Sequence, residues 1–440
     1  MKRTLKTAGA LTLAMFILFG TACGGVTPES NEPEVQEINL DATVPAYEEA
    51  KVQAKPTTGL KERPNYALEE GADTLEQRMM ILKAMEDQLT FRWAPVDTFT
   101  YQKSGAAAGK DFVFEPHTLY AGLPYSNAGL GLLHALEYYD FETGLLYDMK
   151  EVKGNANMKL GNSCAAAVNW ALASVCPNMI ASTTFEITPS YGYVTVGDYE
   201  FPADCKKYTD LCTTEMITNQ NGEERMWEAL ALTMPGDVLI TNGSSKQGDH
   251  AMMVYALPTV VLDSNGKIDP VKSNIHIIDQ WVTEHVEDFN GDKASMRGRI
   301  DVEYTFAKLT EKHFLPMRAE DLSNDKGYEK ATAELTKEVT CLEDLKKSAI
   351  KTNYRTVKVE SAIVSESGNT VYIKKDVTDR TNYPIKTDRS INCKSIVPGK
   401  DAMGILEPGK TYTMKVRVLL ATGDYPTICE FPVTLEDITK

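Results

Sequence analysis

The stretch Leu160-Gly-Asn-Ser-Cys-Ala-Ala-Ala-Val-Asn-Trp-Ala-Leu-Ala-Ser-Val175 decides the fold of the central part of this chain. Gly-Asn-Ser is typical of a turn followed by a helix N-cap, and the alanine-rich run behind it, with Val168 and Leu172 at helical spacing, predicts a helix. Cys164 then falls in the first turn, where unpaired backbone N–H groups and the helix dipole favour a thiolate and can receive an oxyanion. The segment indicates either a nucleophile or a small buried cysteine in a core helix.

Three predicted strands follow this helix. Met234-Pro-Gly-Asp-Val-Leu-Ile240 has the pattern of a turn that enters a strand, and Gly248-Asp-His-Ala-Met-Met-Val-Tyr255 begins a second strand with His250 at its first residue. A third strand, Asn274-Ile-His-Ile-Ile-Asp-Gln-Trp281, follows the turn at 263–266 and should pair beside the second. A histidine at the start of a strand can face a cysteine at a helix start and act as its general base.

The order of these segments resembles that of the NlpC-type cysteine peptidases and of the related cysteine, histidine-dependent amidohydrolases (CHAP). The resemblance covers roughly residues 91–290. It implies an α+β, papain-like fold in which a helix packs on an antiparallel sheet, and cleavage of peptide or amide bonds, in many members within peptidoglycan. The matching segments are Gly122-Leu-Pro-Tyr125, Asn162-Ser-Cys-Ala-Ala-Ala-Val-Asn-Trp-Ala171, Pro235-Gly-Asp-Val-Leu239 and Asp249-His-Ala-Met-Met-Val-Tyr255.

The resemblance implies that Cys164 is the nucleophile and His250 the base. For the third catalytic residue it leaves two alternatives. Asp279 stands before Gln280, where the amidohydrolases carry an acidic residue followed by Gln, whereas NlpC-type enzymes often place a second histidine on this strand, which would be His276. Strand alternation puts the two on opposite faces, so only one can point at the site, and we favour Asp279.

Three further residues are candidates for binding substrate. Tyr125 resembles a tyrosine that lines the active site of the family. Ser163, which precedes the nucleophile, and His276 are the other two. We expect no cofactor and no metal, because no pair of cysteines has the Cys-x-x-Cys spacing of a zinc site.

The N-terminus has the pattern of an export signal. Lys2, Arg3 and Lys6 precede an apolar run, 8–19, which is too short to span a bilayer. The following Gly-Thr-Ala-Cys23 resembles the lipobox of bacterial lipoproteins. This predicts a signal peptide over 1–22, a lipid on Cys23, and an extracytoplasmic protein anchored to the outer face of the cell membrane.

The net charge of the chain limits the classes of partner that it is expected to bind. The net charge is −16, and removal of residues 1–22 takes away three positive charges. So acidic a chain is not expected to bind nucleic acid or to hold anionic lipid by surface charge. We expect a monomer whose partners are a cell-wall peptide and, through the lipid, the membrane.

Composition and periodicity divide the mature chain. The segment 23–70 is rich in Pro, Glu and Thr, a composition that predicts a disordered tether. Thr74–Thr90 predicts an amphipathic helix with a core-facing stripe of Leu75, Met79, Leu82, Met85 and Leu89. Alternation in Thr411–Leu419, after Pro408-Gly-Lys410, predicts a late strand. The predicted parts are a tether at 23–70, a papain-like hydrolase domain at 71–318, a connector at 319–349 and a small β-sandwich (Ig-like) domain at 350–440.

Seven cysteines remain besides Cys23. Cys205 and Cys212 are near enough in sequence to be bridged, and Cys393 and Cys429 share a late segment, but spacing alone does not decide either pairing. An odd number in an exported protein leaves at least one free thiol.

The sequence therefore favours a membrane-anchored cysteine peptidase or amidase that acts on peptidoglycan stem peptides. Two other classes stay open. One is an inactive papain-like lipoprotein that binds cell-wall peptides or other surface ligands, and the other is an adhesin or assembly factor whose C-terminal β-domain does the work.

Overall fold

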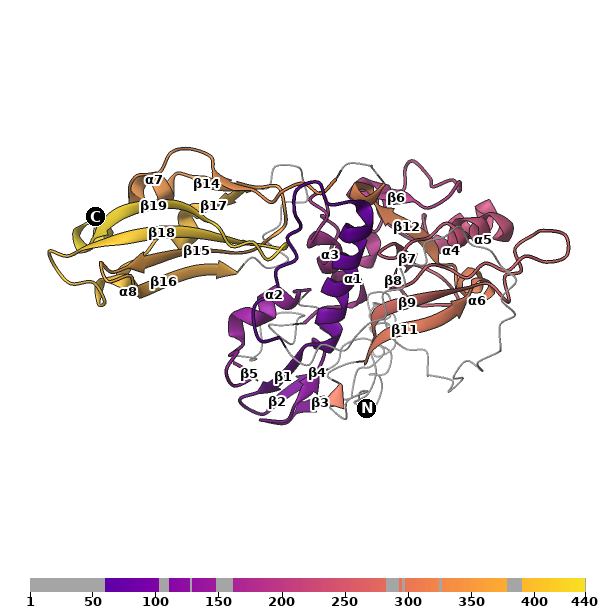
Figure 1. Cartoon of the computed structure of the whole chain (residues 1–440), viewed down its shortest axis with the longest axis horizontal. Coiled ribbons are helices and arrows are strands. Elements are labelled where there is room, and N and C mark those ends of the chain that lie inside the picture. Colours follow the sequence, from indigo (N-terminus) through magenta and orange to yellow (C-terminus); the bar gives the residue numbers. More distant parts are fainter. Residues whose placement is uncertain are drawn as a thin grey trace, which may run out of the picture.

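The computed structural model describes residues 60–102, 111–126, 129–147, 161–281, 293–294, 297–323, 327–377 and 390–439. The predicted signal peptide, Cys23 and most of the predicted tether lie outside these residues. The described part is α+β, as predicted: C-terminal strands lie at one end of the molecule, the N-terminal helix lies in the middle, and a larger antiparallel sheet lies at the other end (Figure 1). No helix in these described ranges is long and apolar enough to cross a bilayer.

The larger sheet has the strand order β11-β9-β8-β7-β12-β6, and every strand is antiparallel to its neighbours. The predicted strands around His250 and Asp279 are confirmed and pair with one another. The bounds are β6 Tyr193–Thr195, β7 Val238–Thr241, β8 His250–Val254, β9 Asn274–Trp281, β11 Arg297–Thr305 and β12 Leu315–Ala319.

Helices cover both faces of this sheet. On one face α1 (Thr74–Thr90) and α3 (Cys164–Ala173) pack against β8 and β9. The other face buries a separate apolar cluster, which α5 (Glu223–Ala231) and α6 (Phe306–Glu311) complete. Since successive residues of a strand point to opposite faces, both sets of side chains in β7 and β8 are buried. A further helix, α4 (Thr214–Asn221), contacts α5 and β7.

The predicted helix Thr74–Thr90 is confirmed with the same bounds. A capping box at Asp73 and Glu76 fixes its first turn. The predicted core stripe is wrong at one position: Met79 is 43% exposed. Its neighbour Arg78 is buried instead, because it donates to the carbonyl of Pro235 and forms an ion pair with Asp237.

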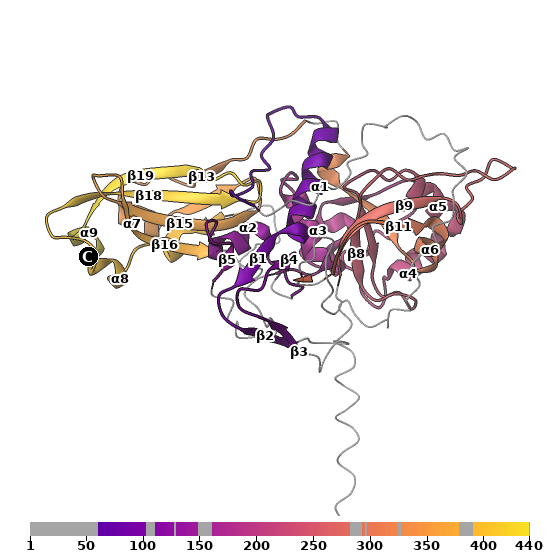
Figure 2. The same ribbon diagram turned by 60° about the horizontal axis from the view of Figure 1, so that its bottom comes forward.

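Two small sheets lie beside the first helix, and Figure 2 shows them below it. Trp93, Phe114 and Tyr120 form the aromatic core between them. The chain then turns at Gly122, whose φ is +78° and where a Cβ would lie 2.9 Å from the carbonyl oxygen of Leu89. The bounds are β1 Arg92–Pro95, β2 Phe99–Gln102, β3 Asp111–Phe114, β4 Tyr120–Ala121, α2 Leu132–Ala135, β5 Leu145–Leu146 and β10 Lys293–Ala294.

The C-terminal part contains two antiparallel sheets, ordered β13-β14-β17 and β16-β15-β18-β19. The predicted late strand is confirmed, and its alternating side chains from Tyr412 to Val418 are buried. Residues 319–349, for which the sequence predicted a connector, hold β13 and α7, and β13 pairs with β14. The bounds are β13 Ala333–Leu335, α7 Leu342–Lys346, β14 Ala349–Thr352, β15 Thr356–Val364, β16 Thr370–Val377, β17 Ser390–Asn392, α8 Lys400–Met403, β18 Thr411–Leu420, β19 Thr427–Thr434 and α9 Leu435–Thr439.

Residues 60–70, which the sequence placed in a disordered tether, lie against the C-terminal part. The amide of Tyr66 donates to the carbonyl of Thr422 at 2.8 Å. Arg63 and Lys358 both pair with the buried carboxylate of Glu137. Aromatic and charged side chains thus fix a segment whose overall composition indicates disorder.

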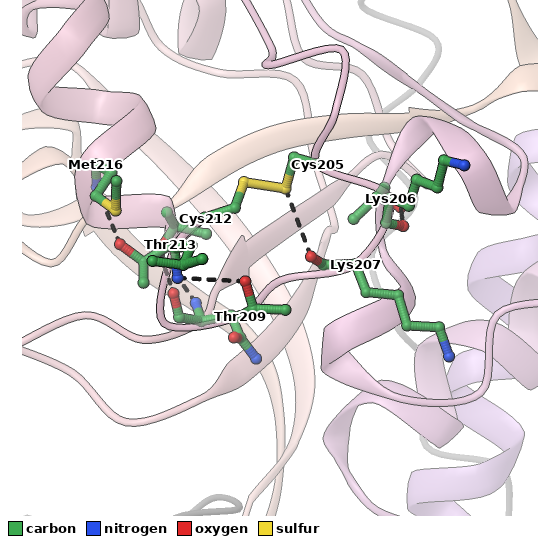
Figure 3. The surroundings of a disulfide bond; sticks show 11 residues. Cys205, Lys206, Lys207, Thr209, Cys212, Thr213 and Met216 are labelled. Carbon is green, nitrogen blue, oxygen red and sulfur yellow. Dashed lines mark hydrogen bonds between the residues drawn. A yellow bond between two sulfur atoms is a disulfide. The ribbon is translucent and has the colours of Figure 1, made fainter.

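One disulfide joins Cys205 to Cys212, with their Cα atoms 5.9 Å apart, so that possible pairing is confirmed. Figure 3 shows the short loop that it closes, in which the amide of Cys212 also donates to the carbonyl of Thr209. Cys393 and Cys429 are not bridged. The other cysteines among the described residues form no disulfide; they are Cys164, Cys176, Cys341, Cys393 and Cys429.

Candidate active site

The first turn of α3 holds Cys164 at its first residue. Ser163 is the N-cap, and its hydroxyl accepts from the amide of Ala166. Gly161 precedes the cap with a φ of +102°, and a Cβ there would lie 2.1 Å from the carbonyl oxygen of Pro124. This position therefore requires glycine, which brings the start of α3 against the segment containing Tyr125.

Tyr125 lies beside the thiol. Its backbone forms a parallel bridge with Asn162, whose amide donates to the carbonyl of Pro124 at 3.1 Å. The Tyr125 hydroxyl donates to Cys164 Sγ, and the oxygen and sulfur are 3.9 Å apart. The sequence-predicted tyrosine is thus brought to the candidate nucleophile.

His250 begins β8 at the end of the sheet where α3 starts. Its Nε2 lies 2.6 Å from Oδ2 of Asp279, and the Cys164 thiol is also a hydrogen-bond partner of the ring. Because Nε2 contacts Asp279, Nδ1 is the ring nitrogen that remains available to the thiol. Burial lowers the pKa of His250, but the charge and hydrogen bonding of Cys164 and Asp279 outweigh it, so the net shift is upward.

Asp279 is fully buried on β9 and is held from both sides. Arg299, on the neighbouring strand β11, donates its Nε to Oδ1 at 2.8 Å and its Nη2 to Oδ2. Burial alone would raise the pKa of Asp279, but Arg299 and then His250 lower it to about 2. The carboxylate is therefore ionised at neutral pH and can stabilise a protonated imidazole.

Trp281 packs against the imidazole of His250. The ring centroids of His250 and Trp281 lie 4.6 Å apart in an edge-on arrangement. The guanidinium of Arg299 lies over the same indole, 4.4 Å from its centroid. These contacts limit how far the imidazole can rotate.

The structure does not bring His276 to this site. It lies on the opposite face of β9 from Asp279, where its Nδ1 lies 2.6 Å from Oδ1 of Asp301. Of the two alternatives for the third residue, only Asp279 contacts His250. Ser163, the other candidate for binding substrate, uses its hydroxyl as the helix cap.

Two charged residues near the site had not been identified from the sequence. One is Arg299. The other is Asp249, which is buried and accepts from the amide of Gly243 at 2.9 Å. Burial raises the pKa of Asp249, and the nearby charge of Cys164 raises it further. Asp249 could have been identified from the sequence because it directly precedes His250. Nothing in the sequence around Arg299 indicates that it lies at the site.

The arrangement can support nucleophilic catalysis. It offers a thiol at a helix N-terminus, a ring nitrogen facing that thiol, and an ionised carboxylate behind the ring. Within the described ranges no three His, Cys, Asp or Glu side chains are grouped to hold a metal ion.

Comparison with known proteins gives no relative from which a role could be carried over. No family model, no curated protein and no solved structure matches this chain.

Proposed function

We propose that this protein is a cysteine peptidase or amidase. The observation that carries the proposal is the continuous line from Cys164 through His250 to Asp279, with the nucleophile at a helix start and the base at a strand start. A plain buried cysteine needs neither an imidazole beside it nor a carboxylate aligned behind that imidazole. Among the histidines that the structure describes, His250 has this combination of partners.

The proposed reaction is acyl transfer through a thioester. Nδ1 of His250 takes the proton of the Cys164 thiol, and the thiolate sulfur adds to the substrate carbonyl carbon. The amides of the first turn of α3 face the oxygen that becomes negative. The imidazolium then returns its proton to the leaving amine as the carbon–nitrogen bond breaks. A water molecule, deprotonated by His250, hydrolyses the thioester and restores the thiol.

The finer fold assignments belong to the same proposal. The packing of α3 on an antiparallel sheet whose strand β8 carries the base supports a papain-like hydrolase domain. The two C-terminal sheets support a small sandwich of the Ig type. The motif resemblance and the export signal together favour amide bonds of peptidoglycan stem peptides as substrate, with the protein acting as a monomer.

Replacement of Cys164 tests the chemistry. We expect Cys164→Ser and Cys164→Ala to abolish digestion of purified wall material, and we expect iodoacetamide to alkylate Cys164 in the native wild-type protein. Cys341→Ser is the matched control, because Cys341 is an exposed free thiol distant in sequence from the site. Digestion by Cys164→Ala at the wild-type rate, with no native alkylation of Cys164, would contradict the enzyme assignment.

A second function is favoured by one observation. Cys164 is wholly buried and His250 is only 3% exposed, so the thiol is closed to a bulky substrate in this conformation. An inactive papain-like lipoprotein that binds wall peptides would have such a site. Alkylation at mildly acidic pH distinguishes the two, because a thiolate–imidazolium pair reacts there, whereas a buried neutral thiol reacts only after denaturation.

The location is tested separately. We expect metabolic labelling with a radioactive fatty acid to mark the wild-type chain, and Cys23→Ser to abolish the label and release the protein from the membrane fraction. Retention of label in Cys23→Ser would exclude Cys23 as the lipid site.

A further inference from the structure

Strand β11 contains a bulge next to the candidate active site. Arg299 pairs with Asp279 and Val302 pairs with Ile277, so two residues of β11 lie opposite one residue of β9. The second of the two, Asp301, has a φ of +61°, a conformation that residues other than glycine rarely adopt. Bulges of this kind redirect side chains in a strand.

The bulge changes which face Arg299 occupies. Arg299 and Tyr304 are five positions apart, so a regular strand would point them to opposite faces. The extra residue brings them to the same face, where Nη1 of Arg299 donates to the Tyr304 hydroxyl at 3.2 Å. Trp281 and Tyr304 now flank the guanidinium, whose carbon lies 4.4 Å and 5.9 Å from their ring centroids.

His276 contacts the bulge from the opposite face of the sheet. Its Nδ1 lies 2.6 Å from Oδ1 of Asp301, and its Nε2 lies 3.7 Å from the carboxylate of Glu303. Because Asp301 is the residue in the unusual conformation, this contact stabilises the part of the strand that regular pairing would otherwise straighten. His276 is thus connected to the site through the backbone of β11.

We propose that Arg299 is a positioning residue of the hydrolase, which aims Asp279 at His250, and that the His276–Asp301 pair maintains the bulge that puts Arg299 in place. This inference rests on the proposed function. A guanidinium binds a carboxylate through two parallel hydrogen bonds, so it fixes the plane of the carboxylate as well as its charge. Oδ2 of Asp279 is shared by Arg299 and His250, which couples the two groups directly.

The test measures the rate of Cys164 alkylation against pH in the full chain. Arg299→Gln removes a positive charge near the thiolate–imidazolium pair, which should raise the pKa of both groups. Both limbs of the plot of rate against pH, the acidic rise and the alkaline fall, should therefore move to higher pH. The maximal rate should fall about 10- to 100-fold, because Asp279 is no longer held in position. Arg299→Lys keeps the charge but loses the two-point contact, so the limbs should stay while the maximum falls. Arg225→Gln, an exposed arginine on α5, is the control.

The bulge is tested by Asp301→Asn, which tolerates the same backbone conformation but weakens the contact with His276. We expect a lower maximal rate with unmoved limbs, because Arg299 retains its charge. This variant also decides the matter if Arg299→Gln does not fold. A profile for Arg299→Gln that coincides with wild type, or an unchanged rate for Asp301→Asn, overturns this inference alone. Wild-type protein whose Cys164 is not alkylated at any pH overturns the proposed function and this inference with it.

Discussion

The guanidinium carbon of Arg355 lies 4.0 Å from the centroid of the Trp170 ring. Trp170 belongs to α3, the helix that begins with Cys164, so the C-terminal part of the chain packs directly on that helix. Nη1 of Arg355 also donates to the carbonyl of Ala181, and the hydroxyl of Tyr354 donates to the carbonyl of Val175. The C-terminal strands therefore form part of the framework that holds the site.

Arg355→Ala should lower the free energy of unfolding by about 2–3 kcal/mol, because it removes a cation–π contact and leaves a buried carbonyl without its donor. Urea unfolding followed by tryptophan fluorescence measures the change. Arg225→Ala, at an exposed position, should change stability by less than about 0.5 kcal/mol. Equal stability of the Arg355 and Arg225 variants would show that the two parts of the chain are not energetically coupled through this contact.

Asp279→Asn should reduce both hydrolysis and Cys164 alkylation at neutral pH by about 10²–10⁴-fold, because an amide cannot stabilise the imidazolium that the mechanism requires. The same change leaves the Arg299 charge without its buried partner. Rates measured at saturating and limiting substrate separate the loss in kcat from any change in KM. Asp198→Asn, on an exposed loop, is the matched control, and a kcat for Asp279→Asn within twofold of it would remove Asp279 from the site.

The residue at which a helix or strand begins could be predicted from the sequence more accurately than the residues that pack against it. Turn and cap residues stand directly before Cys164 and before His250, so the start of α3 and the start of β8 could both be predicted. Hydrophobic spacing also predicted the bounds of α1, but not that Arg78 rather than Met79 faces the core, because that depends on Asp237, more than 150 residues away in sequence.

Arg299 shows why part of the site could not be predicted. In Arg-Ile-Asp-Val-Glu-Tyr, regular alternation groups Ile300 with Val302 and Tyr304, and assigns Arg299 to the other face. The bulge reverses that assignment, and a bulge depends on pairing with β9, which a single strand's pattern does not contain. The choice between Asp279 and His276 stayed open for the same reason: alternation separates the two faces but does not say which one meets His250.

Glu86 should make stability depend on pH. Burial is the main cause that raises its pKa to about 7, and the Tyr255 hydroxyl, which donates to it at 3.1 Å, only partly opposes this. The folded chain therefore binds a proton that the unfolded chain releases near pH 4.5, so stability should fall as pH rises from about 4.5 to 7. Glu86→Gln should remove that fall and be more stable than wild type at pH 8 by about 2–3 kcal/mol.

Urea unfolding at pH 5 and pH 8 checks this prediction. The control is Glu228→Gln, an exposed glutamate on α5, which should keep the wild-type dependence. A Glu86→Gln protein that loses the same stability as wild type between the two pH values would show that Glu86 is not the responsible group.

Asp237 joins α1 and β12 to the turn that precedes β7. Its carboxylate accepts from Arg78 of α1 at 3.0 Å, from Arg318 of β12 at 2.9 and 2.7 Å, and from the amide of Met234 at 2.9 Å. Asp237→Asn keeps the shape but removes the negative charge between two arginines, one of which is almost fully buried. Removal of one partner from a buried ion pair leaves an uncompensated charge, so we expect a loss of about 3–5 kcal/mol in the free energy of unfolding. Asp204→Asn, at an exposed position, should be close to neutral, and a similarly small effect at Asp237 would mean that apolar packing alone holds α1 on the sheet.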